Sequence, residues 1–160
     1  MNPTEFVRHV HSYTSDYTRF ADTKAGFVLA TAGVLFGVVA PRVSLLPMTW
    51  TSGPDVLRAV LLVIFVIADA LAFYHAVGAV RATVMGSAHS LVAFPAVALL
   101  SPPNYAVLVS SISEDARVEQ VSTHIIELGQ IALRKYRQVN QALTALEVAA
   151  FYAASVVIAR

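Results

Sequence analysis

Two carboxylates stand out because each interrupts a long apolar run. Asp69 is the only formal charge within residues 59–80, and Glu147 is the only one within residues 138–159. An ionised carboxylate at mid-bilayer depth costs at least about 2.5–3.5 kcal/mol. Two such groups that face each other can share a proton. In an oligomer they can also form acidic rings that attract cations.

The same side chains also fit a structural role. Each carboxyl group can instead be protonated and hydrogen-bonded to a neighbour, with Thr31 and Tyr152 at nearby depths. His75 lies in the same apolar run as Asp69. A single His at such a position is more often a hydrogen-bonded packing residue than a proton relay. None of the five His residues has metal-ligand spacing. We also find no phosphate-binding loop and no nucleophile motif, so the sequence does not predict an enzyme.

The composition is that of a membrane protein. Hydrophobic residues make up 57% of the chain and charged residues 13%, whereas soluble domains average about 45–50% and about 25%. The net charge is only +1, so the sequence does not predict the basic surface that nucleic-acid binding needs. The chain has no cysteine, which excludes disulfides and thiolate metal sites.

Three apolar segments are candidates to cross a bilayer, which takes about 20 helical residues. The uncharged run at 25–40 is slightly short, so we expect its helix to continue through Pro41 toward Leu46 or the membrane to thin around it. The predicted fold is all-α: a single integral membrane domain over residues 1–160, a helical bundle with three transmembrane helices and cytosolic helical extensions. The predicted spans and extensions are an N-terminal helix at 1–24, spans at 25–46, 57–80 and 138–159, and a cytosolic central region at 81–137.

The central region is the hardest segment to interpret. It has no charge from residue 82 to residue 113, and prolines interrupt it at Pro95, Pro102 and Pro103. We expect a loop with short helices there. A re-entrant hairpin or a fourth span within 87–112 is the alternative. Ser113, followed by two acidic residues, is a typical N-cap for the long helix that comes next.

Apolar residues recur with alternating spacings of three and four in both long terminal helices, which is the heptad pattern of helices that pack side by side. The N-terminal seam is Phe6, Val10, Tyr13, Tyr17, Phe20, Lys24 and Phe27. The C-terminal seam is Val118, Val121, Ile125, Leu128, Ala132, Lys135, Val139, Ala142 and Leu146. These seams predict a stalk formed within one chain or between chains, and we expect a homo-oligomer in the lipid bilayer.

Basic residues predict the orientation of the chain. Eight of its eleven Lys and Arg residues precede the first span or lie in the central region. Because cytoplasmic segments carry an excess of basic residues, the N-terminus and the central region are predicted to be cytoplasmic. Basic side chains beside a span normally anchor it and contact anionic lipids. Lys24, beside Asp22, can serve this purpose or belong to a switch or packing point. The basic residues among 134–137 can serve it or bind a phosphate-bearing ligand.

The two segments where these helices enter the membrane resemble a known family. Residues 21–30, Ala-Asp-Thr-Lys-Ala-Gly-Phe-Val-Leu-Ala, are similar to the "D-(S/T/A)-K-A" start of the first span in Pycsar-system membrane effectors of bacteria. Residues 131–137, Ile-Ala-Leu-Arg-Lys-Tyr-Arg, resemble the "I-A-x-x-K-(Y/F)" start of their last span. The order of the spans also matches. The matching positions are Asp22, Lys24, Lys135 and Tyr136.

The resemblance implies an antiphage role at the bacterial inner membrane. A companion nucleotide cyclase makes a cyclic pyrimidine mononucleotide, the effector impairs the membrane, and the infected cell stops growing or dies. No nucleotide-binding β-barrel is recognisable, so any nucleotide site has to come from the cytosolic helices and the central region. The candidate phosphate contacts are Arg81, Arg117, Arg134 and Arg137. A structural or assembly protein and a small ungated channel are the alternatives.

Overall fold

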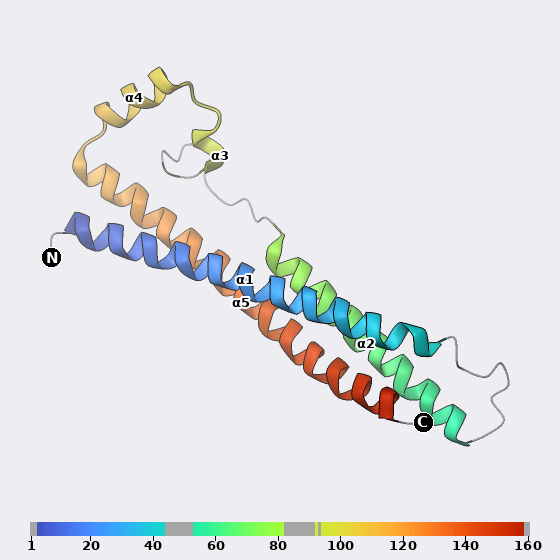
Figure 1. Ribbon diagram of the computed structural model, residues 1–160. Helices are drawn as coiled ribbons and strands as arrows, with labels where there is room; N and C mark the ends of the chain where they lie inside the picture. The colour runs from blue at the N-terminus through green and yellow to red at the C-terminus, as the bar shows by residue number, and fades with distance from the viewer. Residues whose placement is uncertain (1–2, 44–52, 82–91, 93, 159–160) are drawn as a thin grey trace. The chain divides into compact units, whose positions relative to one another are not determined.

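The computed structural model describes residues 3–43, 53–81, 92 and 94–158. These residues form five helices and no strand (Figure 1). The helices are α1 (Pro3–Val43), α2 (Gly53–Val80), α3 (Phe94–Val97), α4 (Pro102–Ser111) and α5 (Glu114–Ile158). Three of them, α1, α2 and α5, are long and apolar enough to cross a membrane. The predicted all-α class with three spans is therefore confirmed.

The chain divides into two compact units. We call the first the bundle, made of Ala21–Arg81 with Lys135–Arg160. We call the second the head, made of Met1–Phe20 with Ala82–Arg134. Both α1 and α5 contribute residues to each unit, because neither helix breaks at the boundary.

Local signals in the sequence set the ends of the long helices. Helix α1 begins at Pro3, where the fixed φ of proline suits a first helical position, and continues through Pro41 to Val43. Helix α5 begins after Ser113, whose Oγ accepts a hydrogen bond of 3.3 Å from the backbone N–H of Ala116. This contact confirms the expected N-cap. The 45 residues of α5 are continuous, which gives a helix about 70 Å long at about 1.5 Å per residue.

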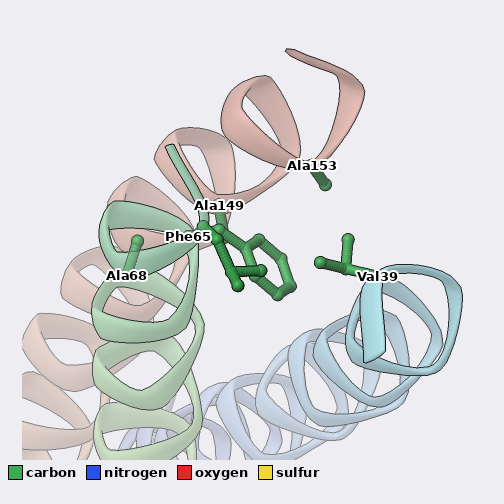
Figure 2. Packing of buried hydrophobic residues seen from close by; sticks show 6 residues of the cluster. Val39, Phe65, Ala68, Ala149 and Ala153 are labelled. Carbon is green, nitrogen blue, oxygen red and sulfur yellow. The ribbon is translucent and has the colours of Figure 1, made fainter. Parts of the chain in front are cut away.

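Alanine dominates the core of the bundle. Three clusters of buried residues each draw side chains from α1, α2 and α5. They are Val39, Leu62, Phe65, Ala68, Ala149 and Ala153; Val28, Ala72, Ala76 and Ala142; and Ala21, Ala25, Ala79 and Val139. Figure 2 shows Phe65 filling the space between Val39 and the alanines of the first cluster. Small side chains let the helix backbones approach closely, which is how membrane helices gain packing energy.

The order of the clusters gives the helix directions. Val39, near the end of α1, packs with Leu62 and Phe65 in the first half of α2, whereas Ala21 packs with Ala79 at the end of α2. Helix α2 therefore runs antiparallel to α1. Residue numbers in α5 rise together with those in α1 from cluster to cluster, so α1 and α5 run parallel in the bundle.

Large apolar side chains cover the outside of the bundle. On α2 the exposed ones are Val56, Leu57, Val60, Val63, Val66, Ile67, Leu71, Phe73, Tyr74, Val77 and Val80. A monomeric soluble protein rarely exposes a continuous apolar surface of this extent. Small residues inside and large apolar residues outside are the arrangement expected of helices in hydrocarbon, so the structure supports a membrane protein.

The two predicted seams have different outcomes. The α5 seam is the packing face: Ala132, Lys135, Val139 and Ala142 are buried, and its other members are half-buried. The α1 seam is not. Its aromatic members are between 43% and 70% exposed, and α1 instead buries Ala21, Ala25, Val28, Ala32 and Val39. The aromatic spacing identified one face of α1, but small residues decide which face packs.

The head pairs the first parts of α1 and α5. The rings of His11 and His124 lie 5.6 Å apart, and Arg117 Nη2 donates a 2.8 Å hydrogen bond to the carbonyl oxygen of Val109 in α4. Helix α4 has ten residues, which is too short for a span. The described part of the central region therefore contains short helices, as expected. Residues 87–91 and 93 of the alternative span lie outside the described residues.

Candidate functional site

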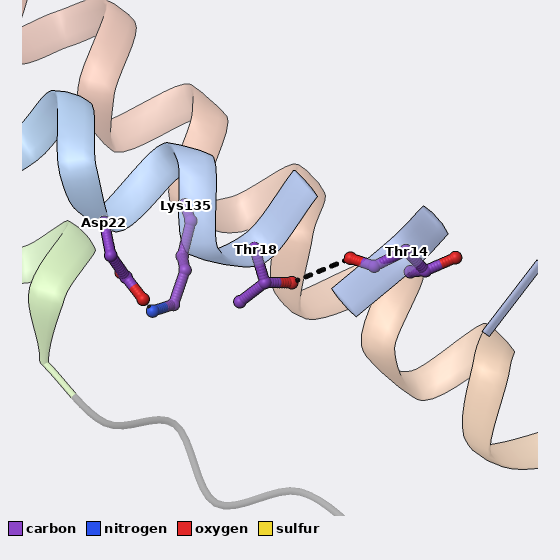
Figure 3. A network of polar contacts seen from close by, with 4 residues as sticks. All are labelled: Thr14, Thr18, Asp22 and Lys135. Atoms are coloured by element: carbon purple, nitrogen blue, oxygen red, sulfur yellow. Dashed lines mark hydrogen bonds and ion pairs between the residues drawn. The ribbon is translucent and has the colours of Figure 1, made fainter. Parts of the chain in front are cut away.

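An ion pair joins α1 to α5 at one end of the bundle. The ammonium of Lys135 contacts Asp22 Oδ1, and the two side chains point toward each other in Figure 3. Lys135 is 8% exposed because it occupies a seam position between Ala132 and Val139. Its long side chain therefore needs a partner close to the core. The side chain of Asp22 is 39% exposed and provides that partner.

A second contact joins the same two helices, and here α1 provides the cation and α5 provides its partner. Lys24 Nζ of α1 lies 5.8 Å from the ring centroid of Tyr136 in α5, within the range of a cation–π interaction. Tyr136 also packs against the cluster that contains Ala79 of α2. All four residues selected by the family resemblance thus meet in one place. We call Asp22, Lys24, Lys135 and Tyr136 the clamp.

The clamp connects two helices. It contains one carboxylate, two ammonium groups and a phenol, and each of its two described contacts joins α1 to α5. Breaking a buried pair by removing one partner is costly, because it leaves an uncompensated charge away from water. The clamp therefore fixes how α1 and α5 are aligned at this end of the bundle.

The two carboxylates of the spans occupy different environments. Asp69 is 7% exposed on α2, and its Oδ1 has no hydrogen-bond partner in the part of the chain that the structure describes. Glu147 is exposed on α5. It comes five residues after the buried Ala142, and about 3.6 residues per turn place it on the opposite side of the helix. Within one chain the two carboxylates do not face each other.

The structure describes other contacts for the partners considered for these carboxylates. The Thr31 hydroxyl donates a 2.9 Å hydrogen bond to the carbonyl oxygen of Phe27, one turn back in its own helix. Tyr152 packs against the cluster that contains Phe65. Asp69 lies along α2 between Ala68 and Ala72, which belong to two neighbouring apolar layers.

His75 is hydrogen-bonded across the bundle. Its Nδ1 lies 2.8 Å from Gln138 Oε1 of α5. Gly78 makes room for this contact, since a Cβ atom there would lie 3.3 Å from the same oxygen. Gln138 was not among the predicted site residues. The sequence feature that could have indicated a close contact here is Gly78, a glycine in a helix interior three positions after His75.

The four candidate arginines are divided between the two units. Arg81 and Arg137 are exposed in the bundle, and Arg117 and Arg134 are exposed in the head. The structure describes no single site that contains all four. Among the described residues, no group of three or more His, Cys, Asp and Glu side chains is placed to hold a metal ion.

The fold and the clamp define a class: a small multi-pass helical membrane protein whose polar side chains connect its helices. The model of the Pycsar effector protein domain matches residues 6–160. The chain belongs to this family, and it is a membrane effector of Pycsar antiviral defence, a pathway that includes a cyclase partner. Neither the curated proteins nor the solved structures gave a match.

Proposed function

We propose that this protein impairs the bacterial inner membrane when a companion cyclase produces a cyclic pyrimidine mononucleotide. The match to the Pycsar effector domain over residues 6–160 supports the signalling context. Three spans support an action at the membrane. The observation that carries the proposal is the clamp, because the residues of both family motifs meet there across two helices.

The continuous helices suggest how a signal reaches the bundle. Helices α1 and α5 each have residues in the head and in the bundle, and neither is interrupted. A ligand that favours one arrangement of these helices in the head shifts their arrangement in the bundle, provided that it binds the two states with different affinity. The clamp residues are among the first bundle positions on these helices, so they are placed to resist or transmit such a shift.

Recognition of the nucleotide is assigned in this proposal to exposed guanidinium groups, which match phosphate oxygens in geometry and charge. Arg117 and Arg134 in the head are the first candidates, followed by Arg81 and Arg137 in the bundle. The excess of basic residues supports a cytoplasmic location for the N-terminus and the central region, where a cyclase product would be found. The proposed action requires no catalysis by this chain.

Membrane potential in living bacteria tests the proposal. A voltage-sensitive dye is followed in cells that express the protein with an active cyclase or with a catalytically inactive cyclase. Depolarisation only with the active cyclase is the expected result. Equal depolarisation in both strains would indicate an ungated channel instead. Unchanged potential in both strains, with the protein present in the membrane fraction, would favour a structural or assembly role.

A further inference from the structure

The outer faces of the bundle differ in polarity. On α2, large apolar side chains such as Val60, Val63 and Ile67 are exposed along the whole span. On α5, four exposed positions at the level of Ala142 and Ala149 carry polar side chains, beside the exposed apolar Leu143 and Val148. We call these four residues the polar strip: Asn140, Gln141, Thr144 and Glu147.

The polar strip is unfavourable against lipid. A carboxylate in the hydrocarbon costs at least about 2.5–3.5 kcal/mol, and an amide without a partner also loses its hydration. The Thr144 hydroxyl is satisfied within the helix, since it donates a 3.1 Å hydrogen bond to the carbonyl oxygen of Asn140. The amides of Asn140 and Gln141 and the carboxyl group of Glu147 remain exposed. This face therefore needs polar neighbours or water in the membrane.

A groove extends the polar surface sideways from the strip. It has a volume of about 460 Å³, lies between α2 and α5, and is lined by His75 together with Asn140, Gln141 and Thr144. Its remaining lining is apolar and includes Ala68 and Leu71. His75 already directs Nδ1 to Gln138. The ring can therefore present its other nitrogen to a neighbour, so the groove adds hydrogen-bonding capacity beside the strip.

We propose that the polar strip is the surface on which copies of this chain meet, and that it lines a water-filled path for cations through the assembly. The inference rests on the proposed membrane-impairing function and names the face that carries it. Asp69 is not part of this path, because it is buried within each copy.

A second copy fits the strip better than any other occupant. Copies that insert in the same direction bring identical residues to the same depth, so each amide meets an amide that can both donate and accept hydrogen bonds. Asn140, Thr144 and Glu147 are spaced by four and three residues, the spacing at which one helix packs along another. Glu147 carboxylates then form a ring at one depth, and acidic rings select cations.

The chain contains no cysteine, so single cysteines report on each face without background. Thr144→Cys places a thiol in the polar strip. Ala70→Cys is the matched control: it is also a small exposed residue, and it lies on α2 between Ala68 and Ala72 at a similar level of the bundle. Mild oxidation of membranes is expected to give disulfide-linked dimers with Thr144→Cys and none with Ala70→Cys.

A second readout concerns the path itself. In cells with the active cyclase, a membrane-impermeant cationic thiol reagent is expected to reduce depolarisation by Thr144→Cys and not by Ala70→Cys. Glu147→Gln is expected to lose the preference for cations over anions, and Asp69→Asn is expected to keep it. If Thr144→Cys does not insert, Asn140→Cys replaces it in the same assays.

Failure of the inference and failure of the proposed function give different results. Cyclase-dependent depolarisation without strip-specific cross-linking, or with equal cross-linking of both variants, would overturn the inference and leave the function standing. Strip-specific cross-links with no effect of thiol reagent or of Glu147→Gln would overturn the proposed path. No depolarisation by the unmodified protein would refute the proposed function, and the path with it.

Discussion

Asp22→Ala is expected to destabilise the protein more than Lys135→Met, although the two substitutions remove opposite ends of one ion pair. Asp22→Ala leaves an ammonium group on a residue that is only 8% exposed. Lys135→Met leaves a carboxylate on a side chain that is 39% exposed and can be hydrated. Methionine also keeps the aliphatic volume that lysine contributes to the seam.

The expected magnitudes follow from this difference in burial. Removing one partner of a buried pair costs about 3–5 kcal/mol, and the partial exposure of Asp22 lowers the expected loss for Asp22→Ala to about 2–3 kcal/mol. For Lys135→Met we expect about 1 kcal/mol or less. The measurement is unfolding of the purified protein by a denaturing detergent, monitored by circular dichroism. The Asp22→Ala/Lys135→Met double variant completes a double-mutant cycle.

Asp16→Ala is the control, because Asp16 is an exposed aspartate on the same helix. Surface substitutions of this kind change stability by roughly 0.5 kcal/mol or less. If Lys135→Met proved at least as destabilising as Asp22→Ala, the difference in burial between the two partners would not determine the cost of breaking the pair. If neither variant differed from Asp16→Ala, the clamp would have no structural role.

Ala76→Leu is expected to disrupt the bundle. Ala76 is 0% exposed and lies in a layer with Val28, Ala72 and Ala142, so protein atoms cover its side chain completely. Added methylene groups in a packed site typically cost about 1–3 kcal/mol. We expect the upper part of this range, because the surrounding alanines cannot move aside without separating the helices.

Ala70→Leu is the matched control, six residues earlier on the same helix and exposed. There the larger side chain enters lipid, and we expect no measurable loss of stability in the same detergent titration. Similar tolerance of leucine at both positions would mean that the three helices do not pack through small residues. The assigned core of the bundle would then be incorrect.

Apolar periodicity in the sequence was sufficient to predict the spans and the packing face of α5. The run around Asp69 and the seam through Val139 and Ala142 both appear as predicted, because length and spacing are local properties. The seam of α1 differs since Tyr13 and Phe20 mark an apolar face without indicating whether protein covers it. The contact of Ala21 and Ala25 with α5 depends on small size, which an apolar pattern does not emphasise.

The clamp was only partly predictable. The resemblance identified Asp22 and Lys135, but they are 113 residues apart, and no local pattern indicates that they form a pair. The hydrogen bond from His75 to Gln138 was missed for the same reason. The outward direction of Glu147 was available from the sequence, because the α5 seam through Ala142 already fixed which side of that helix packs.

The central claim is that a cyclic pyrimidine mononucleotide switches this protein from an intact to a leaky membrane state. Its most direct test uses the purified full-length protein in sealed liposomes that contain anionic lipid and a potassium gradient. We predict potassium efflux after the pyrimidine nucleotide is added, and none with a cyclic purine nucleotide or with empty liposomes. Efflux of equal rate without any nucleotide, or no efflux after the pyrimidine nucleotide is added, would contradict the account.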